Sequence, residues 1–201
     1  MVRIKTEDRA LVLNQTRQAL LVAAAEEFAH LGYDQANINN ISINSGFAKG
    51  TIYNYFPSKQ ALLLALIDDI SQEHFEYLRS AILTVDDPAI RLERFFQAGF
   101  EYVVSHTYRA RVMFNTVNGS NQEQKAYCFQ AYQPTFQLVA EKILLPGMQQ
   151  NTFRQAEPMS TAILLMTIYL GTASQVDEQG RPWLDSSVVA GFVLRALRPV
   201  E

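Results

Sequence analysis

The stretch that decides the fold runs from Ile38 to Phe56 and reads INNISINSGFAKGTIYNYF. Apolar residues recur at helical spacing on both sides of Gly46, which predicts two short helices over Ile38–Ser45 and Lys49–Tyr55. Gly46 can adopt the left-handed conformation that ends a helix. A helix, a glycine turn and a second short helix form a helix-turn-helix, whose second helix enters the major groove of DNA. The stretch therefore predicts a DNA-binding element.

The two faces of this element differ in chemistry. Its apolar residues can pack against a preceding helix, expected over 16–31 and ending at Gly32; they are Ile38, Ile41, Phe47, Ile52 and Phe56. The other side chains can donate hydrogen bonds or carry positive charge, and none is a carboxylate that would repel phosphate; they are Asn39, Lys49, Thr51, Tyr53, Asn54 and Tyr55. Side chains of this kind contact base edges and phosphate oxygens.

Charge is distributed unevenly along the 201 residues, whose net charge is −3. No acidic residue occurs between Gln35 and Ile67, whereas residues 61–201 contain 11 basic and 15 acidic side chains. A whole-chain charge conceals such local asymmetry. We therefore expect a DNA-binding domain over residues 1–60 and a second, acidic domain over residues 61–201.

The remainder of the chain is expected to be helical, which makes the fold class all-α. Apolar residues recur at 3.6-residue spacing to the end of the chain, and no sustained two-residue alternation is present. The pattern predicts about nine helices, over 16–31, 38–45, 49–55, 59–80, 88–106, 108–117, 122–145, 159–176 and 186–198.

The segment 158–176 carries no charge, yet only 11 of its 19 residues are apolar. We interpret it as a helix covered by protein rather than as a membrane span. A chain of this size has few helices with which to cover it, so a homodimer is expected. The expected interface lies between the last two helices and includes Gly171, Thr172, Val189 and Phe192.

Signals for enzyme chemistry are weak. The three histidines, His30, His74 and His106, lie far apart without metal-ligand spacing, so neither a metal nor a cofactor is expected. Cys128 stands between Tyr127 and Phe129, a setting typical of an inert buried thiol. We expect no catalytic residues. A single cysteine and an N-terminus without an apolar stretch favour a cytoplasmic location.

The segment from Thr16 to Ile67 resembles the N-terminal DNA-binding domain of the TetR family of transcriptional regulators. The resemblance rests on Ala24-Ala25, Phe28, Gly32-Tyr33, Ile41, Gly46, Lys49–Phe56 and Ser58-Lys59. It implies that Asn39, Lys49, Gly50, Thr51 and Tyr53 lie near bases, and that Asn37, Asn54, Tyr55 and Lys59 lie near phosphates. One departure is Ala48, whose side chain cannot cap the second helix as the serine common in the family would.

The resemblance also implies a small-molecule effector in the second domain. Ten of the 22 aromatic residues lie between Phe95 and Phe136, and they could wall an apolar pocket. The candidate pocket residues are Tyr102, His106, Phe114, Tyr132 and Met166, although His106 could instead end a helix. We therefore expect a one-component repressor that binds double-stranded operator DNA and is released by a mainly apolar effector. The alternative is a helical module that binds small molecules or proteins without binding DNA.

Overall fold

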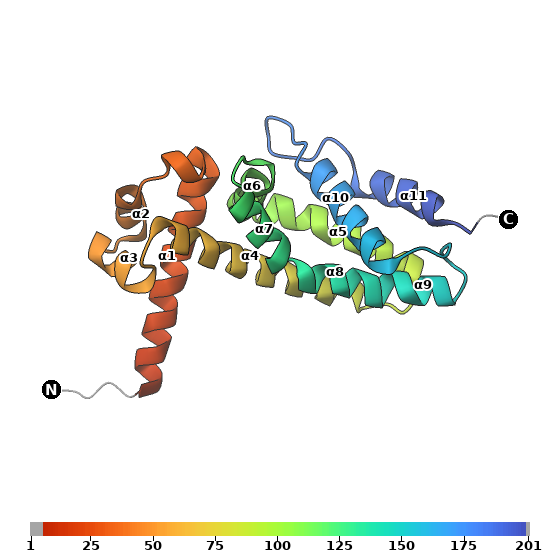
Figure 1. The fold of residues 1–201 in the computed structure, drawn as a ribbon, viewed down its shortest axis with the longest axis horizontal. Helices are drawn as coiled ribbons and strands as arrows, with labels where there is room; N and C mark the ends of the chain where they lie inside the picture. Colours follow the sequence, from red (N-terminus) through yellow and green to blue (C-terminus); the bar gives the residue numbers. More distant parts are fainter. Residues whose placement is uncertain (1–5, 200–201) are drawn as a thin grey trace. The chain divides into compact units, whose positions relative to one another are not determined.

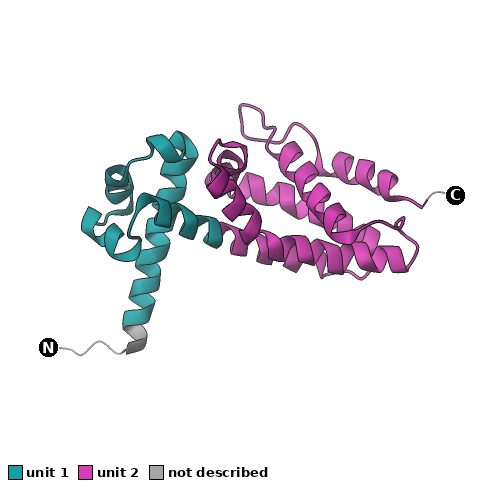
Figure 2. Cartoon of the chain, viewed as in Figure 1, with its two compact units in different colours: residues 1–69 teal, residues 70–201 magenta. Residues whose placement is uncertain are grey.

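The computed structural model describes residues 6–199, and over that range the all-α prediction is confirmed. Eleven α-helices and one short π-helix follow one another over the described residues. Figure 1 shows how these helices are connected along the chain. The only bridge within the described residues joins Val176 to Pro182. The chain divides into two compact units, residues 1–69 and 70–201 (Figure 2). The division falls inside helix α4, Lys59–Ile82, so one continuous helix belongs to both units.

The N-terminal unit contains α1 (Thr6–Gln35), α2 (Ile38–Ser45), α3 (Lys49–Tyr55) and the start of α4. Helix α1 begins ten residues before the expected Thr16, and Gly32 interrupts it with φ of 71°. The predicted inner face of the helix-turn-helix is largely buried: Ile38, Ile41, Ile52 and Phe56 are covered, whereas Phe47 is half-buried.

The C-terminal unit is built around α5, Pro88–Ser105. This helix packs against α6 (Thr107–Asn118), α10 (Pro158–Ala173), α11 (Ser186–Leu197) and the π-helix η1 (Ala140–Leu144). Its large side chains Leu92, Phe95 and Phe96 are fully buried. At Gly99 the ring of Tyr169 approaches so closely that an added Cβ would lie 2.6 Å from its Cε2 atom. The glycine therefore allows α10 to pack directly against α5.

The prediction of one helix over 122–145 is wrong. The structure has α7 (Gln122–Ala131), α8 (Gln133–Val139), η1 and α9 (Leu145–Gln149) in this region. Pro134 stands in the first turn of α8, where the missing N–H costs nothing. Pro146 has no N–H to donate to the Lys142 carbonyl, which instead accepts a hydrogen bond of 2.8 Å from Arg91 Nη1. The two prolines and the wider turn of the π-helix η1 thus divide this region into several short helices.

Helix α10 begins one residue before the expected 159 and ends at Ala173, three residues before the expected 176. The Glu157 carboxylate caps its start by accepting from the N–H groups of Met159 and Ser160. None of the helices described in the structure is sufficiently long and apolar to cross a membrane.

Candidate nucleic-acid interface and effector cavity

The start of α2 is fixed to α1 by a buried carboxylate. Glu27 is only 7% exposed, and its Oε1 atom accepts hydrogen bonds from Asn37 N (2.9 Å) and Asn40 Nδ2 (3.0 Å). The Asn37 side chain in turn accepts from Asn39 N at 2.9 Å and caps the helix. Asn37 therefore has a structural role, and its exposed position leaves the surrounding surface open to a phosphate.

The turn between α2 and α3 depends on Gly46, whose φ of 73° lies in the left-handed region. Its N–H donates to the Ile43 carbonyl at 3.1 Å, and Phe47 N donates to the Ser42 carbonyl at 3.2 Å. The Ser42 hydroxyl donates back to the Phe47 carbonyl. Ala48 makes no side-chain hydrogen bond at the start of α3, as its methyl group requires. Helix α3 is thus held by the turn and by burial of Ile52.

The outer face of α3 is polar and accessible. Lys49, Tyr53 and Asn54 are exposed, while Thr51 and Tyr55 are half-buried. Gly50 is also exposed, and no atom lies within 4 Å of a Cβ placed there, so packing within the protein does not require glycine. Close approach of the backbone to a ligand remains a physical reason for it. Asn39, on α2, is exposed as well.

Lys59 has intramolecular partners that the sequence did not reveal. Its ammonium donates to the carbonyls of Asp34 and Ala36, both at 3.1 Å, and lies 4.7 Å from the ring centre of Tyr33. A cation at the C-terminal end of a helix satisfies carbonyls that lack helical partners. Lys59 therefore ties the end of α1 to the start of α4, and this engagement competes with the phosphate contact expected for it.

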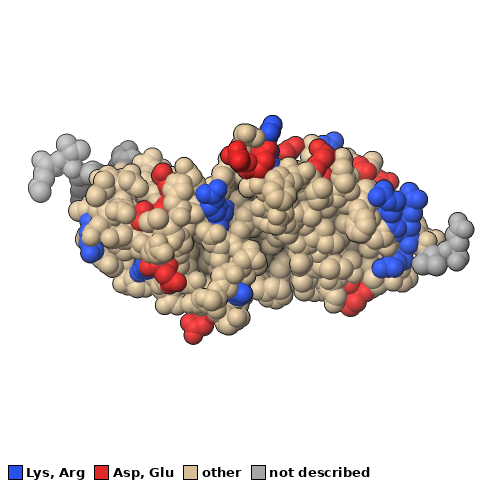
Figure 3. Space-filling model, turned by 90° about the horizontal axis from the view of Figure 1, so that it is seen from above, with Lys and Arg blue, Asp and Glu red and all other residues tan. Residues whose placement is uncertain are grey.

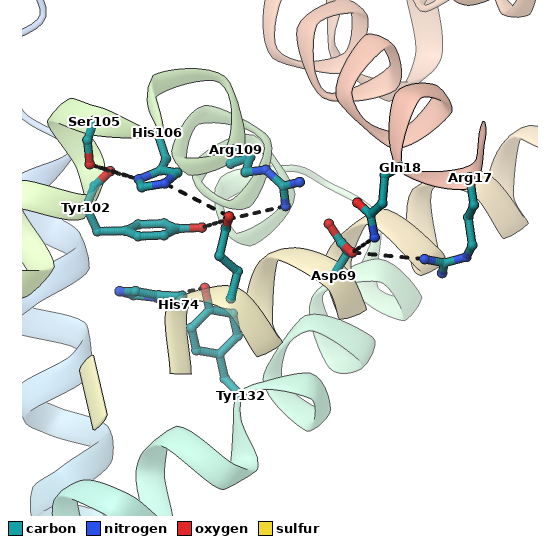
Figure 4. Close-up of polar contacts among 10 residues, drawn as sticks. Arg17, Gln18, Asp69, His74, Tyr102, Ser105, His106, Arg109 and Tyr132 are labelled. Atoms are coloured by element: carbon teal, nitrogen blue, oxygen red, sulfur yellow. Dashed lines mark hydrogen bonds and ion pairs between the residues drawn. The ribbon is translucent and has the colours of Figure 1, made fainter. Parts of the chain in front are cut away.

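A second contact joins α1 to α4 inside the N-terminal unit. Asp69 Oδ1 accepts a hydrogen bond from Gln18 Nε2 at 3.0 Å and lies 4.0 Å from Arg17 Nη1 (Figure 4). The Arg17 guanidinium also lies over the ring of Phe56. Helices α2 and α3 and the first turn of α4 contain two lysines. Lys59 is held by carbonyl groups of the protein, whereas Lys49 has no described intramolecular partner.

The C-terminal unit contains a cavity of about 410 Å³ between α6, α7, α8 and α10. This volume falls within the range of small-molecule sites. Two of the expected pocket residues, Tyr132 and Met166, line it. Phe114 lines a different pocket of about 340 Å³, and Tyr102 and His106 line neither. The residues that sequence reasoning missed here lie mainly on α7 and α10; they include Lys125, Cys128, Phe129, Ile163 and Thr167.

Tyr102 and His106 belong instead to a polar cluster around Glu73 on α4. Tyr102 Oη donates to Glu73 Oε2 at 2.9 Å, and Arg109 Nη1 lies 3.4 Å from the same oxygen (Figure 4). The ring of His106, which stands where α5 ends, stacks on Tyr102 with centres 4.3 Å apart. Burial, followed by the charge of Glu73, raises the pKa of Tyr102. His106 thus stands at the end of α5, which is the alternative to a pocket residue that the sequence left open.

A buried hydrogen-bond chain begins at the cavity wall. Tyr169 Oη donates to the Gly99 carbonyl at 3.0 Å, so the hydroxyl accepts from His74 Nε2 at 3.2 Å. His74 Nδ1 then accepts from Tyr132 Oη at 3.1 Å. Burial, together with the nearby His106, lowers the pKa of His74 to about 3. Neutral His74 thus links α4 to a residue that lines the cavity.

The expected interface residues are divided between the surface and the core. Gly171 and Phe192 are exposed and Thr172 is half-buried, whereas Val189 is buried on the side of α11 that packs against α5. The large apolar side chains of α10 and α11 that are more than half exposed are Leu164, Val188 and Phe192. Charged side chains form small separate groups on the face shown in Figure 3, where uncharged residues dominate.

Comparison with known proteins identifies the helix-turn-helix. Residues 20–66 match the family model described as bacterial regulatory proteins, tetR family. The chain is 30% identical over 101 residues to the HTH-type transcriptional activator FasR of Mycolicibacterium smegmatis, covering 50% of this chain and 46% of that protein. It is 29% identical over 94 residues to the HTH-type transcriptional repressor KstR2 of Mycobacterium tuberculosis, covering 47% of each. The matches thus span about half the length of these relatives.

Solved structures extend the likeness of fold to most of the chain. The transcriptional regulator FadR from Bacillus subtilis, in complex with stearoyl-CoA, superposes with a TM-score of 0.77 at 20% identity, covering 89% of this chain and 95% of that one. AibR, in complex with isovaleryl coenzyme A and operator DNA, gives 0.72 at 18% identity, covering 90% and 97%. Residues 20–66 of this protein, which contain the helix-turn-helix at 38–56, are thus similar to the tetR family of bacterial regulatory proteins.

Proposed function

We propose that the protein is a DNA-binding transcriptional regulator that represses a promoter by occupying its operator as a homodimer in the cytoplasm. The observation that carries the proposal is the outer face of α3, which is accessible, rich in hydrogen-bonding groups and free of carboxylates. Direct readout of bases needs such groups on a helix that can enter the major groove. The family match over residues 20–66 supports the same role.

The residues proposed to contact DNA keep the assignment made from the sequence. Lys49, Gly50, Thr51 and Tyr53 at the start of α3, with Asn39 on α2, are placed near bases. Asn37, Asn54 and Tyr55 are placed near phosphates. For Lys59, the two carbonyl contacts lead us to propose that its main role is to hold α1 against α4.

We further propose that the 410 Å³ cavity binds the effector that releases the protein from DNA. An effector can shift the protein between conformations only by binding one of them more tightly. Tyr132 can couple effector binding to the position of α4, because it lines the cavity and hydrogen-bonds to His74 on α4. Helix α4 continues from the helix-turn-helix segment, so a change in its preferred position alters how α3 meets DNA. The stearoyl-CoA complex of FadR and the ligand and DNA complex of AibR support an effector-controlled regulator.

A gel-shift assay with the DNA upstream of the protein's own gene tests DNA binding. Lys49→Ala and Tyr53→Ala should abolish the specific shift because each removes a proposed base contact, about 1–3 kcal/mol of discrimination. Lys142→Ala, an exposed residue of η1, serves as the matched control and should bind like the wild type. Wild-type binding by both α3 variants would show that α3 is not the recognition helix. No specific shift by the wild type would favour the module that binds ligands or proteins without DNA.

The dimer is tested by Gly171→Glu. Gly171 is exposed, and no atom lies within 4 Å of a Cβ placed there, so the substitution does not disturb the protomer. It places a charge on the face of α10 that we propose to pair with a second copy. Light scattering should show a dimer for the wild type and a monomer for the variant. A monomeric wild type at micromolar concentration would contradict the proposed assembly.

A further inference from the structure

The walls of the 410 Å³ cavity carry one charge. Among the described residues that line it, Lys125 on α7 is the only charged one, and no aspartate or glutamate is present. Lys125 is half-buried and makes no described ion pair. A cation partly removed from water attracts an anion more strongly than one on an open surface.

The burial of the wall residues shows which end of the cavity is closed and which end is open to solvent. Its fully covered wall residues form a floor of sulfur-containing and aromatic side chains: Met113, Cys128, Tyr132, Phe136 and Met166. Its exposed wall residues mark the opening to solvent: Val117, Gln122, Ala126, Phe129 and Thr167. Lys125 and Gln122 stand at the start of α7, so the charge and an amide belong to the open end.

The floor provides no charge for a ligand. Burial raises the pKa of the Cys128 thiol to about 12, so the thiol stays protonated and neutral near pH 7. The Tyr132 hydroxyl donates a hydrogen bond to His74, and burial raises the pKa of this hydroxyl, which therefore stays neutral. The deep end therefore suits a hydrocarbon.

We propose that the cavity binds an alkyl carboxylate, with its hydrocarbon chain on the floor and its single negative charge at Lys125. Gln122 can donate a second hydrogen bond to the carboxylate. One lysine balances one negative charge, which favours a monoanion over a ligand that carries several phosphates. This inference rests on the proposed effector role of the cavity and specifies the chemistry of the head group.

The test compares carboxylates with alcohols of the same chain length. Octanoate, decanoate and dodecanoate, and the three corresponding alcohols, are titrated into the full-length protein by calorimetry at neutral pH. In the wild type we expect the best-bound carboxylate to bind about tenfold more tightly than its alcohol, the ratio that one charge-assisted hydrogen bond supplies. Lys125→Met removes the charge, keeps an unbranched side chain that is one atom shorter, and should reduce this ratio to near one without weakening alcohol binding. Lys142→Met, which removes a lysine outside the cavity, should leave the ratio unchanged.

Equal binding of carboxylate and alcohol by the wild type would overturn the proposal, as would a ratio that persists in Lys125→Met. Failure of every compound to bind would also overturn it. A gel shift on the same preparations separates this result from the proposed function, because specific DNA binding does not depend on the identity of the ligand. Specific DNA binding without carboxylate binding would refute the ligand class alone, whereas loss of both would refute the regulator as well.

Discussion

Protonation of His74 should make the protein sensitive to mild acid. The imidazole is fully buried, and its two nitrogens bond to Tyr132 and Tyr169 in the neutral form. Its pKa is about 3 in the folded state and 6.5 in the unfolded state. The unfolded chain therefore binds the proton more readily, and stability falls as the pH drops below 6.5.

The size of this effect follows from the two pKa values. Each pH unit between them costs about 1.4 kcal/mol, so lowering the pH from 7 to 5 should remove about 2 kcal/mol from the free energy of unfolding. The result at pH 5 is insensitive to the folded-state value, because His74 remains neutral there at any pKa well below 5. The stabilisation from this residue is complete above pH 7 and decreases steadily toward pH 3.

Urea denaturation followed by circular dichroism at pH 7 and pH 5 measures this loss. His74→Gln keeps one donor and one acceptor between the two tyrosines but cannot be protonated, so its loss on acidification should be smaller by about 2 kcal/mol. Identical pH dependence of the wild type and His74→Gln would refute the reasoning.

Three further perturbations test packing and charge. Gly99→Ala should destabilise the protein by about 1–3 kcal/mol in urea denaturation, because its Cβ would overlap the buried ring of Tyr169; an unchanged midpoint would contradict the tight packing of α5 and α10. Lys59→Met should lower the free energy of unfolding by about 1 kcal/mol while leaving the salt dependence of DNA binding unchanged, because its ammonium serves two carbonyls; a shallower salt dependence would restore its phosphate role. Lys49→Ala should reduce the preference for operator over unrelated DNA by about 1–3 kcal/mol per half-site, because the proposed partner of Lys49 is a base edge; an unchanged preference would place Lys49 away from the bases.

The helix-turn-helix is the part of the fold that the sequence predicts in most detail, because its signals are local. Gly46 ends α2, Asn37 caps it, and four of the five expected inward residues, Ile38, Ile41, Ile52 and Phe56, are buried in the structure as their spacing requires. These features depend on side chains within a few residues of one another. The composition of the outer face of α3 follows for the same reason, since burial of Ile52 fixes which neighbours point outward.

Which residues line the cavity, and which polar groups surround it, depends on the tertiary structure. The abundance of aromatic residues between Phe95 and Phe136 predicts a pocket, yet their spacing does not separate Tyr132, which lines the cavity, from Tyr102, which hydrogen-bonds to Glu73. Both are buried tyrosines, Tyr102 on α5 and Tyr132 between α7 and α8, and only the packing of these helices distinguishes them. The same holds for Val189 and Val188, neighbours on α11 that face the core and the solvent, respectively.

Long-range pairing also accounts for the interactions that the sequence could not indicate. Lys59 donates hydrogen bonds to carbonyls at the end of α1. Arg91 donates to the Lys142 carbonyl, to which Pro146 has no N–H to donate. His74 hydrogen-bonds to Tyr132 and Tyr169. Each pairing joins groups more than 20 residues apart. Local spacing determines where helices begin, end and turn their apolar faces, whereas the partner of a buried polar group depends on which helices the whole chain brings together.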